Sequence, residues 1–174
     1  MFSQENDDRP SSVTICPCQE EDLGLVAHFT AEWEAEHITT GYRAETAEDL
    51  RVKLGPYFLL ALWGEEVVGF VVASLHEAAP DEMAIFAAGG RYLEIDELYV
   101  LPAYREQAIG TTLMQAVMQT ARRHGIEHFS VYSSTKQWRS ITAFYEQLGF
   151  QMWFVRMFLS YAPFRLRSVC APLC

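Results

Sequence analysis

Hydrophobic and polar positions follow two different periods along the chain, and each change of period marks a predicted element. Alternating or continuous apolar runs predict strands at residues 13–15, 58–63, 67–75, 92–100, 129–132 and 150–159. Apolar residues at steps of three and four predict four helices, which follow residues 22 and 46, begin at 110, and span 137–148. The predicted buried residues of these helices are Leu23, Val26, Ala27 and Phe29; Leu50 and Leu54; Leu113, Met114, Val117 and Ala121; and Ile141, Phe144 and Leu148.

This order of elements predicts an α/β fold with one mixed, mostly antiparallel central sheet flanked by helices. At 174 residues, of which 50% are hydrophobic, the chain is long enough for one domain, which we place at residues 13–159. Residues 1–12 are polar and acidic, so we expect a disordered tail. The 160–174 extension is compatible with an extra strand, an interface segment or disorder, and the long connection at 76–90 has no assigned role.

Charge and hydropathy exclude several classes of protein. The formal net charge is -10, which disfavours nucleic acid as a partner and favours cationic or neutral substrates. No apolar run is long enough to span a membrane, and the acidic start does not resemble a signal peptide. We therefore expect a soluble, cytoplasmic protein that needs no membrane partner, and its composition is compatible with a homodimer.

Cysteine and histidine do not indicate a metal site in the sequence. The cysteines, whose spacings differ from the C-x-x-C of zinc and redox sites, are Cys16, Cys18, Cys170 and Cys174. The histidines also lack metal-ligand spacing; they are His28, His37, His76, His124 and His128. We expect reduced thiols and no metal.

The most informative local pattern is a strand, a loop at residues 105–110, and an amphipathic helix. Such a loop presents backbone N–H groups at a helix N-terminus, where they and the helix dipole attract phosphate. The alternative is a plain strand-to-helix turn in which Gly110 allows close packing.

Two motifs in this order resemble the GNAT acetyltransferase superfamily. The first follows the strand that contains Leu98, Tyr99 and Val100; it is R-E-Q-A-I-G at 105–110 and resembles Q/R-x-x-G-x-G/A. The second is F-Y-E-Q-L-G-F at 144–150. The resemblance covers residues 13 to about 159 and implies a GNAT-like acyl-CoA N-acyltransferase fold. The chain departs from the family's pattern at Ala108, where the family has its middle glycine. It also has Trp138 and Arg139 where an asparagine is often found.

The resemblance implies that acetyl-CoA is the co-substrate and that it lies in a V-shaped gap between the strand ending near Val100 and the strand at 129–132. Backbone groups of Leu98 and Val100 would contact its pantetheine arm. The full set of implied cofactor-binding residues is Leu98, Tyr99, Val100, Arg105, Glu106, Gln107, Ala108, Ile109, Gly110 and Thr111.

Acetyl transfer to an amine needs a base and an acid. An alkylamine with a pKa near 10.4 must lose a proton, which costs about 4.6 kcal/mol at pH 7. Strand carboxylates are candidates, and a period of two would place Glu94 and Asp96 on one face and Glu97 on the other. By resemblance, Glu94 or Asp96 is the base and Tyr145 protonates the CoA thiolate; solvated acids and simple packing are the plain alternatives.

The predicted function is therefore transfer of an acetyl group from acetyl-CoA to a primary amine. The alternatives are a non-catalytic CoA-binding or CoA-sensing module, which Ala108 would favour, and a scaffold that binds only proteins. The acceptor stays open between small-molecule and protein amines, although Glu32, Glu34 and Glu36 favour a cationic small molecule. By resemblance, Trp33, Glu34, His37 and Tyr42 border the acceptor pocket, and a polar loop is the simpler interpretation.

Overall fold

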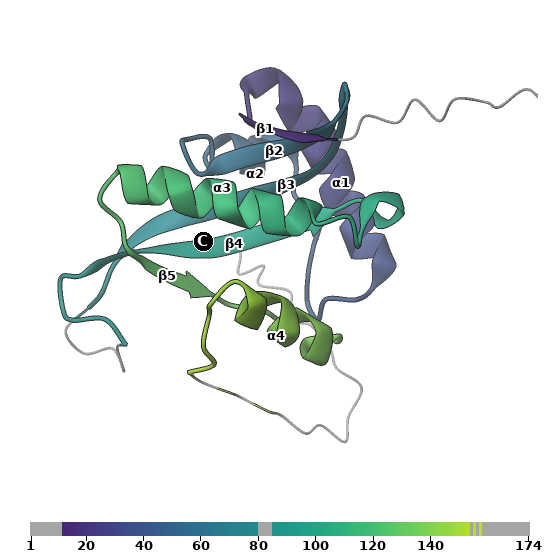
Figure 1. Cartoon of the computed structure of the whole chain (residues 1–174). Helices are drawn as coiled ribbons and strands as arrows, with labels where there is room; N and C mark the ends of the chain where they lie inside the picture. The colour runs from purple at the N-terminus through teal and green to yellow at the C-terminus, as the bar shows by residue number, and fades with distance from the viewer. Residues whose placement is uncertain (1–11, 80–84, 154, 156, 158–174) are drawn as a thin grey trace, which may run out of the picture.

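The computed structural model describes residues 12–79, 85–153, 155 and 157. Five strands and four α-helices make up the fold, with two short 3-10 turns (Figure 1). In chain order the elements are β1 (Val13–Pro17), η1 (Glu20–Asp22), α1 (Leu23–Glu36), α2 (Ala47–Arg51), β2 (Phe58–Trp63), β3 (Glu66–Glu77), β4 (Arg91–Val100), η2 (Pro102–Tyr104), α3 (Ile109–Arg123), β5 (His128–Val131) and α4 (Trp138–Gln147).

The strands form one sheet in the order β1-β2-β3-β4-β5. Neighbours from β1 to β4 are antiparallel, and β4 and β5 are parallel, so the predicted mixed sheet is confirmed. In Figure 1, α3 crosses one face of the sheet, α1 and α2 cover the other, and α4 lies beside the end of β5. None of the helices among the described residues is long and apolar enough to cross a membrane.

Each face of the sheet has its own hydrophobic core. On one face α3 buries residues that recur at three and four residue steps, as predicted, including Leu113, Val117 and Ala121 at 0% exposure. On the other face Leu23, Val26 and Phe29 of α1 pack with Leu50 of α2, although Ala27 is only half-buried. Thr30 is buried in its place because its hydroxyl donates to the Ala27 carbonyl and accepts from the Glu45 N–H.

The second helix is shorter than predicted. Thr46 caps its start, because the Thr46 hydroxyl accepts from the Asp49 N–H and Asp49 accepts from the Thr46 N–H. The helix ends at Arg51, before Leu54, which the sequence pattern had placed on its buried side. Leu54 is consequently outside the helix and half-buried.

Two irregularities in β4 shape the end of the sheet. Pairing with β5 covers only residues 92–95 and stops at the Ile95–Val131 pair, so β5 diverges from β4 as Figure 1 shows. On the β3 side the register shifts, with Val72 opposite Glu97 but Ala73 opposite Ile95. Asp96 is therefore an extra residue, which makes a β-bulge in β4.

The predicted strand at 150–159 is wrong where the structure describes it. Residues 150–153, 155 and 157 are not in a strand, and the exposed side chains there include Trp153 at 53% and Met157 at 88%. Side chains this exposed do not pack on the sheet, so apolar composition alone was misleading. The rest of that segment, the 160–174 extension and residues 1–11 of the predicted tail lie outside the described residues.

Candidate active site

The 105–110 loop has an unusual backbone. Glu106 and Ala108 both have left-handed φ angles, 63° and 60°, and Ala108 is the N-cap of the 15-residue helix α3. The Ala108 carbonyl accepts from the Thr112 N–H at 2.9 Å and its hydroxyl at 3.0 Å, which fixes the first turn. Alternating left-handed residues before a helix make a concave set of N–H donors that suits an anion. This geometry fits the pyrophosphate of a CoA molecule.

The Arg105 side chain does not point to this concavity. Its guanidinium donates to both Glu36 oxygens, at 2.7 and 2.6 Å, and its Nε donates to the Val100 carbonyl at 2.8 Å. It also lies over the Tyr99 ring, 5.4 Å from the centroid. Arg105 is thus held by protein groups, and the anion site depends on backbone donors.

Gly110 is packed against the other predicted motif. A methyl group added there would lie 3.5 Å from Phe144, an ordinary contact distance, and 4.0 Å from Leu98. Space for alanine exists, but a larger side chain would displace Phe144. The glycine accordingly has the packing role considered from the sequence, at the point where α3 and α4 meet.

The edge of β4 beyond residue 95 is open toward β5. The Leu101 N–H donates to the Val68 carbonyl, so alternate residues Leu101 and Tyr99 direct their backbone groups toward β3. Leu98 and Val100 direct theirs away from β3, toward the side of β5, where pairing has ended at Ile95 and Val131. The Val100 carbonyl accepts from Arg105, and among the described residues no strand pairs with its N–H or with the backbone groups of Leu98. The Tyr99 side chain packs on the opposite, α1 face of the sheet.

All three strand acids lie on that α1 face. The expectation that Glu97 lies on the opposite face from Glu94 and Asp96 is therefore wrong. Because β3 pairs without interruption of its own alternation from Gly69 to Glu77, Val72, Ser74 and His76 share a face. Glu97, opposite Val72, and Glu94, opposite Ser74, share it too. The bulge at Asp96 breaks the alternation of β4, which a period of two cannot anticipate.

Glu97 is engaged in a buried network. It is 7% exposed, accepts from Lys53 Nζ at 2.7 Å and from the Tyr42 hydroxyl at 3.2 Å, and Lys53 also donates to Glu45. Burial raises the pKa of Glu97, against the hydrogen bond from Lys53. The pKa of Lys53 is raised by its two carboxylate partners, although burial opposes them. The lysine therefore remains charged and Glu97 is occupied.

Glu94 and Asp96 form a separate group with His76. One ligand atom from each lies within 4.8 Å of the others, and Asp96 accepts a hydrogen bond from Ser74. Glu94 is half-buried, and within the described parts of the chain no side chain donates a hydrogen bond to it. Among the described residues its carboxylate is therefore the least engaged of the three acids.

Tyr145 lies on α4 next to this end of the sheet. It packs with Phe144 and Phe150 in edge-to-face pairs, with ring centroids 5.1 and 5.5 Å apart, against the core that α3 covers. Burial raises the pKa of Tyr145 to about 12. Its phenol is protonated at pH 7, as an acid catalyst requires.

Two connecting loops meet beyond the end of α1. Thr39 bridges to Thr135, the Thr40 N–H donates to the Ser134 carbonyl, and Lys136 Nζ donates to the His37 carbonyl. The 37–46 loop is further held by Tyr42, whose ring stacks on Trp33 with centroids 4.1 Å apart.

Glu34, in the last turn of α1, is also bound to this loop. Glu34 accepts a hydrogen bond from the Ala44 N–H at 3.2 Å. Trp33 and Glu34 of α1 thus contact the 37–46 loop, which contains His37 and Tyr42.

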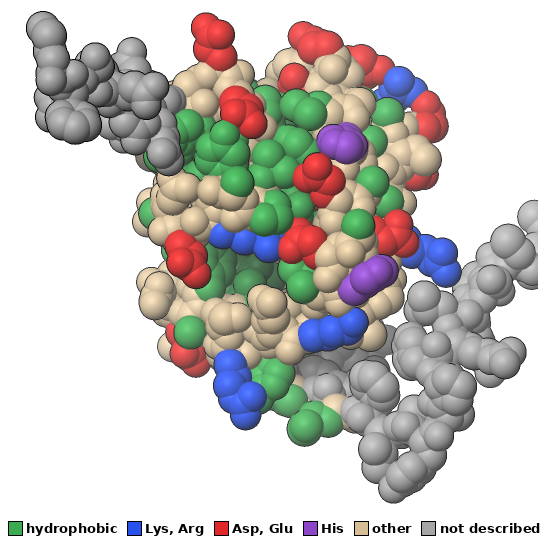
Figure 2. Space-filling view, turned by 90° about the vertical axis from the view of Figure 1, so that its right-hand side faces the viewer, with side chains coloured by type: hydrophobic (Ala, Val, Ile, Leu, Met, Phe, Trp, Pro, Cys, Tyr) green, Lys and Arg blue, Asp and Glu red, His purple; other side chains and the backbone are tan. Residues whose placement is uncertain are grey.

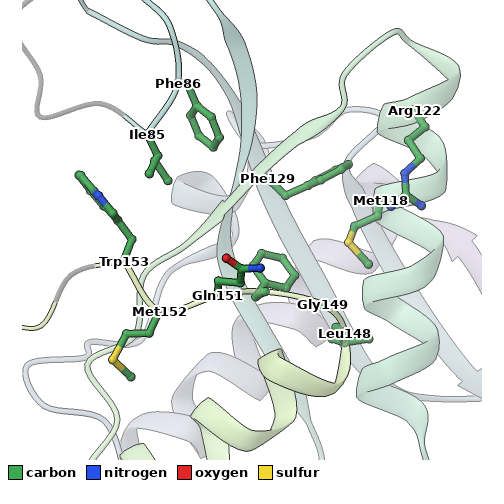
Figure 3. Close-up of a pocket in the computed structure, with 11 residues that line it drawn as sticks. Ile85, Phe86, Met118, Arg122, Phe129, Leu148, Gly149, Gln151, Met152 and Trp153 are labelled. Carbon is green, nitrogen blue, oxygen red and sulfur yellow. The ribbon is translucent and has the colours of Figure 1, made fainter.

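Figure 2 views the molecule from the end where β4 stops and α3 begins. A hollow with hydrophobic side chains at its base crosses this face, and acidic, basic and histidine side chains lie at its edge. A second cavity, of about 420 Å³, lies elsewhere, between the C-terminal half of α3, β5 and the chain after α4 (Figure 3). Met118, Phe129 and Trp153 line it, and none of the predicted site residues does.

Sequence reasoning missed the contacts of three contributors. His76 was assigned to a loop because the predicted strand stopped at residue 75, whereas β3 continues to Glu77. Lys53 was missed, and Glu36 was named without its pairing to Arg105, because the partners Glu97 and Arg105 are distant in sequence. The pairing register of β3 with β4 could have indicated His76, because it lies opposite Tyr92 and one pair away, on the same face, from Glu94.

Comparison with known proteins gives consistent matches. A model of the acetyltransferase (GNAT) family matches residues 23–150. The thialysine N-epsilon-acetyltransferase of Caenorhabditis elegans is 28% identical over 117 residues, which span 66% of this chain and 66% of that relative.

Solved structures share the fold at low sequence identity. An aminoglycoside acetyltransferase from an uncultured soil metagenomic sample, in complex with trehalose, has a TM-score of 0.64 at 20% identity, covering 86% of this chain and 97% of its own. A predicted acetyltransferase with acetyl-CoA from Clostridium acetobutylicum has a TM-score of 0.65 at 15% identity, covering 86% and 96%. At these identities the likeness shows the fold alone.

Proposed function

Because the chain belongs to the acetyltransferase (GNAT) family, we propose that it is an enzyme that transfers an acetyl group from acetyl-CoA to a primary amine. The observation that carries the proposal is the early end of β4–β5 pairing at Ile95 and Val131. It leaves the backbone groups of Leu98 and Val100 unpaired with a strand, beside a loop whose N–H groups suit a pyrophosphate.

The cofactor site would use three parts of the chain. Backbone N–H groups of residues 106–110 and the dipole of α3 would hold the pyrophosphate. Leu98 and the Val100 N–H would bind the amide groups of the pantetheine arm. Arg105 would contribute through its backbone, because Glu36 and Val100 occupy its side chain.

Acetyl-CoA would supply an acetyl group activated as a thioester. The amine nitrogen would bond to the carbonyl carbon, the carbon–sulfur bond would break, and Tyr145 would give its hydroxyl proton to the thiolate sulfur. The raised pKa of Tyr145 keeps this proton in place until sulfur becomes negative.

The base would be Glu94, directly or through a water molecule, with Asp96 as the alternative on the same face. Glu94 is the less engaged of the two, since Asp96 accepts a hydrogen bond from Ser74. Glu97 is a poor base because Lys53 and Tyr42 occupy its oxygens. His76, within 4.8 Å of both candidate bases, could pass the proton on to solvent.

The proposed acceptor is a small cationic amine. The net charge of -10 and the carboxylates of the half-buried Glu94 and the exposed Asp96 favour a positively charged ligand. The sequence relative and the structural neighbour named above are acetyltransferases of thialysine and of aminoglycosides, both of which carry amines. A panel of diamines, amino acids and aminoglycosides therefore includes the expected chemistry.

The test measures two quantities on the full chain: the shift of melting temperature with acetyl-CoA, and CoA release in the presence of each amine. A ligand that binds only the native state stabilises it by about 2.7 kcal/mol at one hundred times Kd. A thermal shift with amine-dependent CoA release supports the enzyme. A shift without release from any amine would favour the non-catalytic CoA-binding module, and no shift would contradict both.

A further inference from the structure

Glu36 is the last residue of α1, and it binds the first residue of the 105–110 loop. Its two carboxylate oxygens accept from the two terminal nitrogens of Arg105, and Oε1 also accepts from the Tyr99 hydroxyl at 2.9 Å. A bidentate pair of this kind fixes both the distance and the orientation of its partners. One carboxylate thereby joins α1, β4 and the 105–110 loop.

The Arg105 side chain is committed to this junction. Its Nε is bound to the Val100 carbonyl and its guanidinium lies over the Tyr99 ring. The hydrogen bonds from Arg105 hold the pKa of Glu36 below its usual value, although burial acts in the opposite direction. The pair is therefore charged at neutral pH, and it is only partly exposed, at 36% for Arg105 and 20% for Glu36.

The next residue of the chain begins the 37–46 loop. His37 ends α1 in a left-handed conformation, and its carbonyl accepts from Lys136 Nζ at 2.6 Å. Ile38 and Thr40 bond to the 134–136 segment after β5. The end of α1 is thus the shared attachment point of the 37–46 loop and, through Glu36, of the 105–110 loop.

We propose that Glu36 is a positioning residue that couples the two loops, so that binding of CoA at the 105–110 loop orders the 37–46 loop. A ligand that restricts the Arg105 backbone restricts its rigid guanidinium fork, and Glu36 transmits the restriction to the end of α1. Coupling of this kind is an ordering effect and needs no change of mean structure. The inference rests on the proposed function, because it requires CoA to bind.

Amide hydrogen exchange of residues 37–42, with and without saturating CoA, measures the coupling directly. In the unchanged chain CoA should slow exchange by about fivefold or more, the lower end of typical coupling between sites. Glu36→Gln keeps the size of the side chain but removes its charge, and it should abolish this slowing while CoA still raises the melting temperature. Glu32→Gln, one turn earlier on the same helix, is the control and should retain it.

A purely structural role for Glu36 gives a different result. Exchange in Glu36→Gln would then be faster by the same factor with and without CoA, and the CoA effect would survive, which would overturn the coupling. If Glu36→Gln does not fold, Arg105→Lys serves in its place, because it keeps the charge but lacks the guanidinium fork. It should reduce the slowing of exchange by CoA, and undiminished slowing would overturn the coupling. If CoA does not bind the unchanged chain at all, the result would instead contradict the proposed function.

Discussion

Replacing Ala108 by glycine should stabilise the protein, which is the reverse of the usual effect of this substitution in or beside a helix. Ala108 has φ 60° and ψ 10°, a left-handed conformation. That conformation costs an L-residue about 1–2 kcal/mol, and glycine adopts it freely. Glycine also gives the unfolded chain more conformational entropy, which lowers the free energy of unfolding by about 0.4–1 kcal/mol and offsets part of this gain. The expected net gain is about 0.8 kcal/mol.

The assay is thermal unfolding followed by circular dichroism, without ligand and with saturating acetyl-CoA. For a chain of this size about 1 kcal/mol corresponds to about 2–4 °C, so the melting temperature of Ala108→Gly should rise by about 2–3 °C. The control is Ala143→Gly, at an exposed position inside α4, which should lower it by about 2–4 °C because glycine costs about 1 kcal/mol in a helix. Acetyl-CoA should bind Ala108→Gly at least as tightly, because a methyl group has been removed from the loop.

The two substitutions delete the same methyl group and should act with opposite signs. If Ala108→Gly melts as low as Ala143→Gly, the left-handed backbone at residue 108 carries no strain and the reasoning is wrong. If it is more stable but binds acetyl-CoA more weakly, the Ala108 methyl group contributes to the cofactor site.

Three further predictions concern the site. Tyr145→Phe should leave acetyl-CoA binding intact and slow turnover by about 100-fold or more, and full activity of this variant would make the tyrosine a packing residue. Because the pKa of this phenol is about 12, the unchanged chain should lose no turnover through ionisation of Tyr145 up to about pH 11. Glu94→Gln should slow turnover most at neutral pH and recover as the amine deprotonates at higher pH, and the opposite outcome, with Asp96→Asn impaired and Glu94→Gln silent, would move the base to Asp96. Gly110→Ala should keep the thermal shift with acetyl-CoA, and Gly110→Leu should lose it by displacing Phe144; a shift retained by the leucine variant would contradict the close approach of α3 and α4.

Regular elements were predictable where local pattern and packing agree. The amphipathic period of α3 corresponds to its buried face. The apolar runs at 58–63 and 67–75, on either side of Gly64, correspond to the antiparallel strands β2 and β3. The 150–159 segment was misjudged because apolar residues there are exposed where the structure describes them. Composition indicates that a segment can be buried, but it does not supply a neighbour to bury it against.

The site was predictable at the level of motifs but not of contacts. The position of the 105–110 loop and its helix followed from the sequence, whereas the left-handed conformation of Ala108 did not, because alanine rarely adopts it. The engagement of Arg105 by Glu36 and of Glu97 by Lys53 depends on residues far apart in the chain. Such pairs are set by tertiary packing, which no local period reports.

The bulge at Asp96 also changes how β4 should be varied in directed evolution. A library that randomises every second position, 92, 94, 96, 98 and 100, would treat residues of the α1 face and residues that line the α3 core as equivalent. It would also omit Glu97 and Tyr99, which share the face of the acids. The set that samples that face is instead 92, 94, 96, 97 and 99, with two adjacent positions across the bulge. Deleting Asp96 would restore strict alternation and would leave Glu94, Glu97 and Tyr99 on the same face, because their partners on β3 are already two residues apart.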